Sequence, residues 1–319
     1  NPHRHDGIAA FRDRSLALYP GFCASLLDET GIDPEYEACG ELEIALHEDV
    51  RRSLRENEAA GAGERLADGS STYRWCSAEE AIRLEPEVSG PILGALECRR
   101  TAQVRNPRLL QALIASCRRR GVQIEEGVPV HELVIHDGRV VGVRTGSGDI
   151  MGRVTVLCAG AWSAQIAPLA KAVPVHPVRG QMILMKFDTR PFTRVIARGK
   201  TYLVPRRDGH VLLGATEEHD GSFSKRNTAS GIAGLIQTAV KLVPSVANAA
   251  LVTQWTGLRP GTPDDNPYIG AVPGYEGLIV ATGHYRAGLI LTPITAEIVS
   301  CLVHDRSVDV DLSMCAPGR

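Results

Sequence analysis

The chain has 319 residues, of which 44% are hydrophobic, so it is long enough for two domains that each bury a core. Its formal net charge is −2, and lysine and arginine are spread along the chain. This pattern gives no electrostatic reason to expect nucleic acid or an anionic membrane as a partner. The totals therefore favour a small-molecule ligand.

No stretch approaches 18 uninterrupted apolar residues, and the first residues lack the hydrophobic core of a signal peptide. We therefore expect no membrane span and a cytoplasmic location. The eight cysteines form no Cys-x-x-Cys pair, and their irregular spacing suits neither a disulfide scaffold nor a zinc site, so we expect free thiols. Because His3 and His5 have no third ligand nearby, no metal site is expected.

The first pattern in chain order is an amphipathic helix over residues 8–31, with an interruption expected near Pro20-Gly21. Alternating residues at 40–46 predict a strand, and a charged helix is expected over 47–60. The glycines of Gly61-Ala-Gly63 follow a helix and not a strand. We interpret them as a helix stop, not as a nucleotide-binding loop.

The middle of the chain combines two helix starts with a series of short strands. Ser77-Ala-Glu-Glu80 is a capping box that predicts a short helix, and Pro107 is placed to open a helix that ends at Gly121. Strands separated by turns are expected over 122–157, the last of them 154–157.

That last strand ends in the small-residue corner Ala159-Gly160-Ala161-Trp162-Ser163, where Ser163 is expected to cap a helix beginning at about 164. Small residues at the carboxyl end of a strand are typical of ligand sites in α/β sheets. A tight turn needs the same residues, so both interpretations stay open.

The second half of the chain is predominantly antiparallel sheet in this prediction, with Asp208-Gly209 as a hairpin turn. A helix is expected over 228–247, an apolar strand over 277–282 and a final helix over about 292–304.

Two arginines lie in stretches rich in glycine and proline: Arg259 within residues 255–270, and Arg286 within 283–288. This density predicts a shaped loop instead of a helix or an interior strand. An arginine fork in such a loop suits a carboxylate, which it binds in a bidentate pair. Ion pairs that tie loops together explain the same pattern, so both interpretations stay open.

Several short motifs along the chain, weak singly, together resemble the flavin-dependent D-amino acid oxidase superfamily and, within it, the glycine oxidases. The motifs are Ser15-Leu-Ala-Leu-Tyr19-Pro, Thr30-Gly-Ile32, Val156-Leu-Cys-Ala-Gly160-Ala-Trp-Ser163, Pro177-Val-Arg-Gly180-Gln, Tyr202-Leu-Val-Pro205-Arg, Gly214-Ala-Thr216, Gly257-Leu-Arg259-Pro260-Gly-Thr and Gly283-His-Tyr-Arg286-Ala-Gly288. The resemblance covers about residues 12–305.

The resemblance implies catalytic roles for three side chains: Arg259 pairs with the substrate carboxylate, the Tyr202 hydroxyl assists at the same end, and Arg286 lines the pocket. It also implies FAD as the cofactor, with the adenine at the Val130 backbone, the pyrophosphate near Ala159-Gly160 and the flavin ring at the backbone of residues 287–290. The full set of implied FAD contacts is Val130, Ala159, Gly160, Trp162, Arg259, Gly283, Arg286, Ala287, Gly288, Leu289 and Ile290.

The implied fold is mixed α/β: a Rossmann-like FAD domain of residues 1–36, 104–173 and 256–319, interleaved with an antiparallel-sheet substrate domain of 37–103 and 174–255. The G-x-G-x-x-G unit that opens such FAD domains is not found in the sequence. We expect that unit in a segment preceding the first residue. Without it, this polypeptide is not expected to hold FAD.

The implied activity is oxidation of glycine or small D- or N-methyl amino acids to the imine, with O2 as acceptor and H2O2 as product. The expected partners are the amino acid and O2, with a homo-oligomer left open and no nucleic acid. A D-amino acid dehydrogenase that passes electrons to a carrier, or a non-catalytic remnant without the cofactor loop, are the alternatives that the residues leave open.

Overall fold

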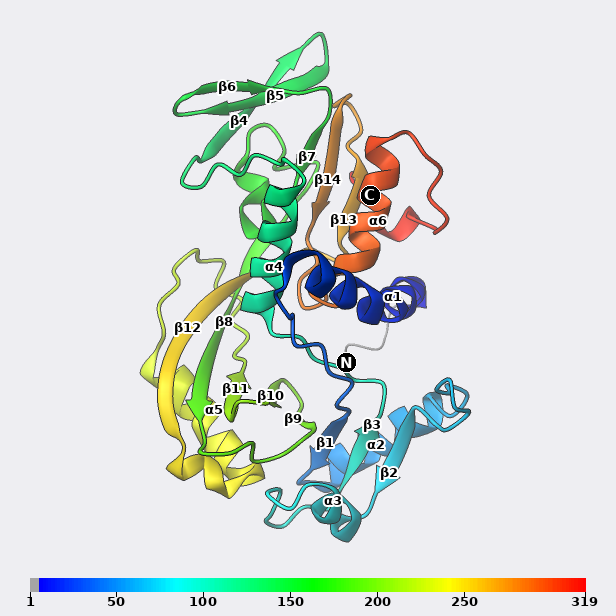
Figure 1. Ribbon diagram of the computed structural model, residues 1–319, viewed down its shortest axis with the longest axis vertical. Coiled ribbons are helices and arrows are strands. Elements are labelled where there is room, and N and C mark those ends of the chain that lie inside the picture. Colours follow the sequence, from blue (N-terminus) through cyan, green and yellow to red (C-terminus); the bar gives the residue numbers. More distant parts are fainter. Residues whose placement is uncertain (1–5) are drawn as a thin grey trace.

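The computed structural model describes residues 6–319 and shows a mixed α/β protein, as predicted (Figure 1). The predicted solvated end with His3 and His5 lies outside the described residues. The helices are α1 (Asp6–Thr30), α2 (Glu48–Ala60), α3 (Ala78–Leu84), α4 (Asn106–Arg119), α5 (Ala229–Leu242) and α6 (Thr292–Val303), with 3-10 turns η1 (Gly160–Gln165), η2 (Pro244–Asn248) and η3 (Ser313–Cys315). The strands are β1 (Glu41–Ala45), β2 (Tyr73–Cys76), β3 (Gly94–Cys98), β4 (Val130–His136), β5 (Arg139–Thr145), β6 (Gly148–Met151), β7 (Thr155–Leu157), β8 (His176–Lys186), β9 (Val195–Arg198), β10 (Thr201–Pro205), β11 (His210–Gly214), β12 (Ala250–Gly261), β13 (Tyr268–Ala271) and β14 (Leu278–Thr282).

An eight-stranded sheet fills the lower half of Figure 1 in the order β12-β8-β11-β10-β9-β1-β3-β2. Every pairing in it is antiparallel except that of β1 with β9. Successive side chains of a strand point to opposite faces. One face carries buried residues such as Leu42, Ile196 and Leu213, which form a core with residues of α3 and α5. At the β1-β3-β2 end, the opposite face packs against Leu54 of α2 in a separate cluster with Tyr73 and Leu96.

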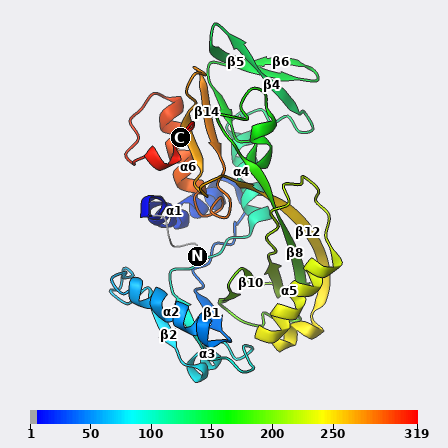
Figure 2. The same ribbon diagram turned by 180° about the vertical axis from the view of Figure 1, so that it is seen from behind.

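A second layer of the molecule surrounds the sheet β13-β14-β7, in which β14 and β7 run parallel. Figures 1 and 2 show α1 beside α6, and buried Phe11 of α1 packs with Ile294 and Ile298 of α6. Tyr19 and Leu109 join α1 to α4 in another cluster. The hairpin sheet β4-β5-β6 projects beyond this layer. Because β12 spans the expected boundary between residues 255 and 256, the division into two domains stays a prediction.

Three local predictions are wrong. The helix α1 continues through Pro20 without interruption, because a proline removes one hydrogen bond whereas the helix buries Phe11, Tyr19 and Leu26. Residues 122–124 form no strand. A loop was predicted over residues 255–270, but residues 255–261 belong to β12, which continues to Gly261. An edge strand tolerates Pro260, which an interior strand would not.

Two expected helix ends are confirmed. Ser77 caps α3 in a reciprocal capping box with Glu80, and Gly61 ends α2. All eight cysteines are free thiols. Among the helices of residues 6–319, none is long and apolar enough to cross a membrane. In the same residues no group of three or more His, Cys, Asp or Glu side chains is arranged to hold a metal ion.

Candidate active site

Arg259 projects from β12 into space that a glycine leaves open. In the pairing of β12 with β8, Arg259 lies opposite Val178, and Gly257 lies opposite Gly180. A Cβ atom built on Gly180 would lie 2.5 Å from Nη1 and 2.7 Å from Nη2 of Arg259. No side chain fits there while the guanidinium keeps its place. Gly180 therefore forms the floor on which the Arg259 guanidinium rests.

Arg259 has no anionic partner within the described part of the chain. Its Nη1 donates a hydrogen bond of 3.1 Å to the Thr216 carbonyl, and no carboxylate oxygen of residues 8–319 lies within 4.0 Å. The ion-pair interpretation thus does not hold for Arg259. It does hold for Arg286, whose Nη1 lies 3.7 Å from Oε2 of Glu217. Of the two arginines, Arg259 is the one that can accept a carboxylate ligand.

Tyr202 lies against the same segment. It is paired with Gly214 of β11, and a Cβ atom at Gly214 would lie 2.8 Å from Cζ of Tyr202 and 2.9 Å from Cε of Met182. Tyr202 and Met182 therefore both pack over Gly214, which has no side chain. Gly214 lies two residues before Thr216, whose carbonyl accepts the hydrogen bond from Arg259. The structure brings Tyr202, Arg259 and Arg286 together around residues 214–217, although the three come from distant parts of the sequence.

Glu217 is a central residue that sequence reasoning missed. Its side chain is only 9% exposed and contacts Lys200, His219 at 3.1 Å and Arg286 at 3.7 Å, and it also interacts with Tyr285. Burial by itself raises the pKa of Glu217, but hydrogen bonds from Lys200, His219 and Tyr285 outweigh it and lower the pKa to about 2. Glu217 is therefore an anion at neutral pH. The motif ending at Thr216 was the only signal near it.

The next acidic residue, Glu218, has a structural role. Its carboxylate accepts hydrogen bonds from Arg179, from Gln181 at 2.7 Å and from the Thr216 hydroxyl at 2.7 Å. Arg179 is 5% exposed and also pairs with Asp220 at 2.9 Å. These contacts fix the segment that follows β11 onto β8, and so fix the carbonyl that Arg259 contacts.

The corner after β7 is tied to the end of β14. The buried Ser163 hydroxyl contacts the Gly160 carbonyl at 2.8 Å and the Thr282 hydroxyl at 2.8 Å. Ser163 therefore does not cap a helix, contrary to the prediction. Residues 160–165 form a 3-10 turn, and the helix expected from 164 is absent. Gly160 has φ +54°, and a Cβ atom there would meet nothing within 4 Å, so open space lies beside this backbone.

The backbone before α6 presents unpaired amides. In the described residues, the N–H groups of Gly288, Leu289 and Ile290 have no backbone or side-chain acceptor. The Tyr19 hydroxyl donates to the Leu289 carbonyl, and the Thr292 hydroxyl donates to the Gly288 carbonyl at 2.9 Å. These residues form a turn that precedes α6, which begins at Thr292 as expected.

Comparison with known proteins assigns the family. Residues 3–302 match the family described as FAD dependent oxidoreductase. The chain belongs to this family. It is 36% identical over 313 residues to a glycine oxidase of Pseudomonas aeruginosa, which covers 98% of this chain and 83% of that protein. It is 34% identical over 316 residues to the hydrogen cyanide synthase subunit HcnC of the same species, covering 97% and 74%. The crystal structure of a glycine oxidase from Geobacillus kaustophilus superposes with a TM-score of 0.91 at 29% identity, covering 99% of this chain and 84% of that one.

The residues of this FAD-dependent oxidoreductase fit the cofactor of its family at two places. The corner at Ala159-Gly160 and the turn of 288–290 follow the parallel strands β7 and β14, and ligands of α/β sheets bind at the carboxyl ends of such strands. Open space beside Gly160 permits close approach of a ligand to the backbone. The unpaired amides before a helix favour an anionic or carbonyl group.

The remaining predicted FAD contacts are more dispersed. Val130 begins β4 in the separate hairpin sheet, and its side chain is 39% exposed. Trp162 is exposed to the same extent, with Lys225 Nζ 5.1 Å from the centre of its ring. Gly283 has φ +75° directly after β14, where a Cβ atom would collide with Thr262. The cofactor roles of these residues stay predictions.

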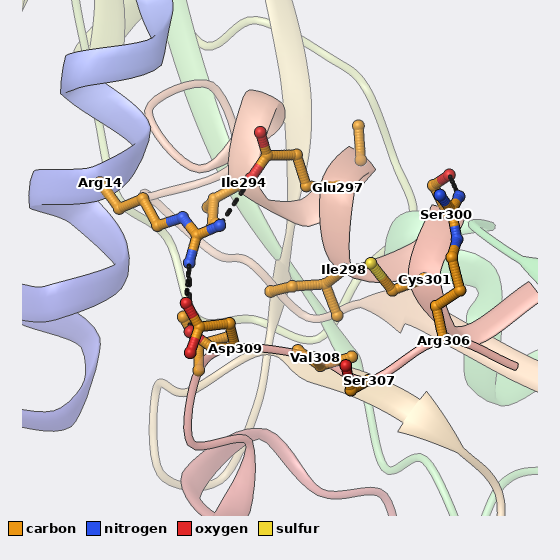
Figure 3. Close-up of a pocket in the computed structure, with 12 residues that line it drawn as sticks. Arg14, Ile294, Glu297, Ile298, Ser300, Cys301, Arg306, Ser307, Val308 and Asp309 are labelled. Carbon is orange, nitrogen blue, oxygen red and sulfur yellow. Dashed lines mark hydrogen bonds and ion pairs between the residues drawn. The ribbon is translucent and has the colours of Figure 1, made fainter.

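A cavity of about 560 Å³ lies elsewhere, between α6, Arg14 of α1 and residues 306–310 (Figure 3). Arg14 donates hydrogen bonds there to Glu297 at 3.3 Å and to the Asp309 carbonyl at 3.1 Å. None of the predicted catalytic residues lines this cavity. It is therefore separate from the candidate active site.

Proposed function

We propose that this FAD-dependent oxidoreductase oxidises the C–N bond of glycine or of small D- or N-methyl amino acids. The substrate loses a hydride from its α-carbon and a proton from its nitrogen to give the imine, which water hydrolyses to the oxo acid and the amine. O2 is proposed as the final acceptor, which yields H2O2. The observation that carries this proposal is Arg259, which has no carboxylate partner among residues 8–319 and rests on Gly180 beside Tyr202.

Arg259 binds the substrate carboxylate in this proposal. A guanidinium binds a carboxylate through two parallel charge-assisted hydrogen bonds, which fix the orientation of the ligand as well as its position. The Tyr202 hydroxyl has no hydrogen-bond partner in the described part of the chain, so it is free to donate to the same carboxylate. Together the two side chains hold the α-carbon in one orientation. This positioning lowers the entropic part of the activation barrier.

FAD, when bound, supplies the two-electron acceptor for this oxidation. The residues proposed to hold it are the backbone of Ala159 and Gly160 and the amides of Gly288, Leu289 and Ile290. Buried Ser163 and Thr282 join these two regions by their hydroxyl contact of 2.8 Å. Two of the relatives are glycine oxidases from Pseudomonas species, which supports a small amino acid as the substrate.

A substrate panel tests the proposal. Glycine, sarcosine, D-Ala, L-Ala and D-Phe are incubated with the purified flavin-loaded protein, and flavin reduction without O2 and H2O2 release in air are measured. We expect glycine, sarcosine and D-Ala to outrun D-Phe, because the side chains of Tyr202, Arg259 and Met182 crowd the carboxylate end. L-Ala reacting as fast as D-Ala would show that the substrate pose is wrong. Flavin reduction without H2O2 in air would assign a dehydrogenase instead.

A further inference from the structure

Three cationic side chains approach the segment after β11 from one side. Lys200 and Arg286 both contact Glu217, whereas Arg259 contacts only the Thr216 carbonyl. Arg259 contacts the carbonyl of Thr216, the residue directly before Glu217. Burial and the neighbouring Glu217 raise the pKa of the Tyr285 hydroxyl to about 12, whereas the positive charge of Arg259 acts in the opposite direction. Among the carboxylates of residues 8–319, Glu217 is therefore the one that contacts the cations of this cluster.

The neighbouring carboxylates do not share this task. Glu218 directs its oxygens to Arg179, Gln181 and Thr216, and Asp220 also pairs with Arg179. Counted at neutral pH, Lys200, Arg259 and Arg286 contribute three positive charges and Glu217 one negative charge. A substrate carboxylate at Arg259 meets an arginine that has no carboxylate partner among residues 8–319, whereas Arg286 is already paired with Glu217.

We propose that Glu217 selects substrates with a single carboxylate, because it occupies Arg286 and Lys200 and repels a second carboxylate from the site. This inference rests on the proposed function and names the substrate class of that site. If a dicarboxylate bound at Arg259 directs its second anionic group to Arg286, that group meets the anionic Glu217, whose Oε2 lies 3.7 Å from Nη1 of Arg286. Like charges brought together in a recognition site disfavour the wrong ligand strongly.

The side chain of Glu217 thus acts as a negative determinant. Replacing it by glutamine keeps the size of the side chain and removes its charge, which leaves Arg286 and Lys200 without an anionic partner. The two freed cations then suit a second carboxylate. A purely structural role for Glu217 predicts a different result, namely a loss of stability with no change in the preference between one and two carboxylates.

The test measures binding of acetate and malonate to the flavin-loaded protein by flavin absorbance and by ligand-dependent melting temperature. We expect the parent to prefer acetate, and Glu217→Gln to raise the ratio of malonate to acetate affinity by about tenfold or more, as expected for relief of like-charge repulsion. The kcat/KM ratio for D-Asp over D-Asn should rise with it. Glu97→Gln is the matched control, because Glu97 is equally buried and holds Arg74 at 2.9 Å and Arg99 at 3.2 Å far from the site.

The outcomes separate cleanly. An unchanged ratio in Glu217→Gln, or an equal rise in Glu97→Gln, overturns the inference. If Glu217→Gln does not fold, Glu217→Asp should retain the acetate preference, and Lys200→Met, altered at an exposed side chain, should leave malonate no better bound than in the parent. Better malonate binding in either variant overturns the inference. A parent that selects acetate but oxidises no amino acid overturns the proposed function instead.

Discussion

The carboxylate end of the candidate site and the turn before α6 are built from opposite kinds of groups. The first consists of charged side chains on and after strands: Arg259, Arg286 and Glu217. The second consists of backbone amides held by neutral groups. Burial raises the pKa of Tyr19 to about 12 and lowers the pKa of His284 to about 4, so both stay uncharged at neutral pH.

This difference agrees with what each region is proposed to bind. A substrate carboxylate arrives from water with a full negative charge. A guanidinium, which is fully charged and donates two parallel hydrogen bonds, is suited to bind it. A bound cofactor that changes its charge during the reaction is better served by fixed dipoles, since they need no counter-ion and no proton exchange. Variants should therefore affect binding in the first region, and stability or cofactor retention in the second.

The largest effect is expected for Arg259→Lys. An ammonium cannot reproduce the bidentate fork, and we expect a loss of about 2–4 kcal/mol in kcat/KM for amino acids, mostly through KM. The melting temperature should change little, because Arg259 makes a single hydrogen bond to protein. Steady-state kinetics and a thermal melt check both points. Parental kinetics with a lower melting temperature would make Arg259 structural.

Tyr19→Phe should act on the turn and not on the substrate. It removes the donor to the part-buried Leu289 carbonyl, and the loss of such a hydrogen bond costs about 0.5–1.5 kcal/mol. We expect a lower melting temperature and faster FAD release at an unchanged KM. Tyr36→Phe is the control, because Tyr36 stacks on Tyr19 at 6.3 Å without such a contact. A raised KM in Tyr19→Phe would contradict the separation of the two regions.

Gly180→Ala tests the floor under Arg259. The added methyl group would lie within 2.8 Å of the guanidinium, so Arg259 must move, and we expect about a tenfold rise in KM from the misplaced fork. Gly257→Ala is a closely matched control on the paired strand, since its Cβ atom would meet nothing within 4 Å. Equal kinetics in the two variants would remove Gly180 from the account of the site.

The sequence predicted the family, the mixed α/β class and the three side chains that gather around residues 214–217. It mispredicted their backbone: the glycines and prolines around Arg259 indicated a loop, but Pro260 lies on an edge strand, where its missing N–H has no consequence. Whether a strand lies at an edge depends on the sheet order. No local pattern contains that information.

Glu217 and Tyr19 show a second limit. Glu217 acquires its role from Lys200, Arg286 and Tyr285, which meet it only in the folded chain. Tyr19 belongs to the Ser15-Leu-Ala-Leu-Tyr19-Pro motif, but the hydrogen bond from its hydroxyl to the Leu289 carbonyl joins residues 270 positions apart. Periodicity and turn residues describe neighbours in sequence. Contacts of this range follow from packing alone.

The smallest effect concerns pH. His284 contacts the Thr295 hydroxyl at 3.1 Å, and burial lowers its pKa from an ordinary 6.5 to about 4. Between these values the unfolded chain binds a proton that the folded chain does not. The free energy of unfolding therefore keeps its full value above pH 6.5 and decreases as the pH falls toward 4. The decrease between pH 7 and 5.5 is about 1 kcal/mol. Denaturant unfolding at the two pH values should show this loss in the parent and not in His284→Gln. An equal loss in both proteins would assign the titration to another group. KM should not change between these pH values, because the carboxylate end contains Arg259 and an already ionised Glu217.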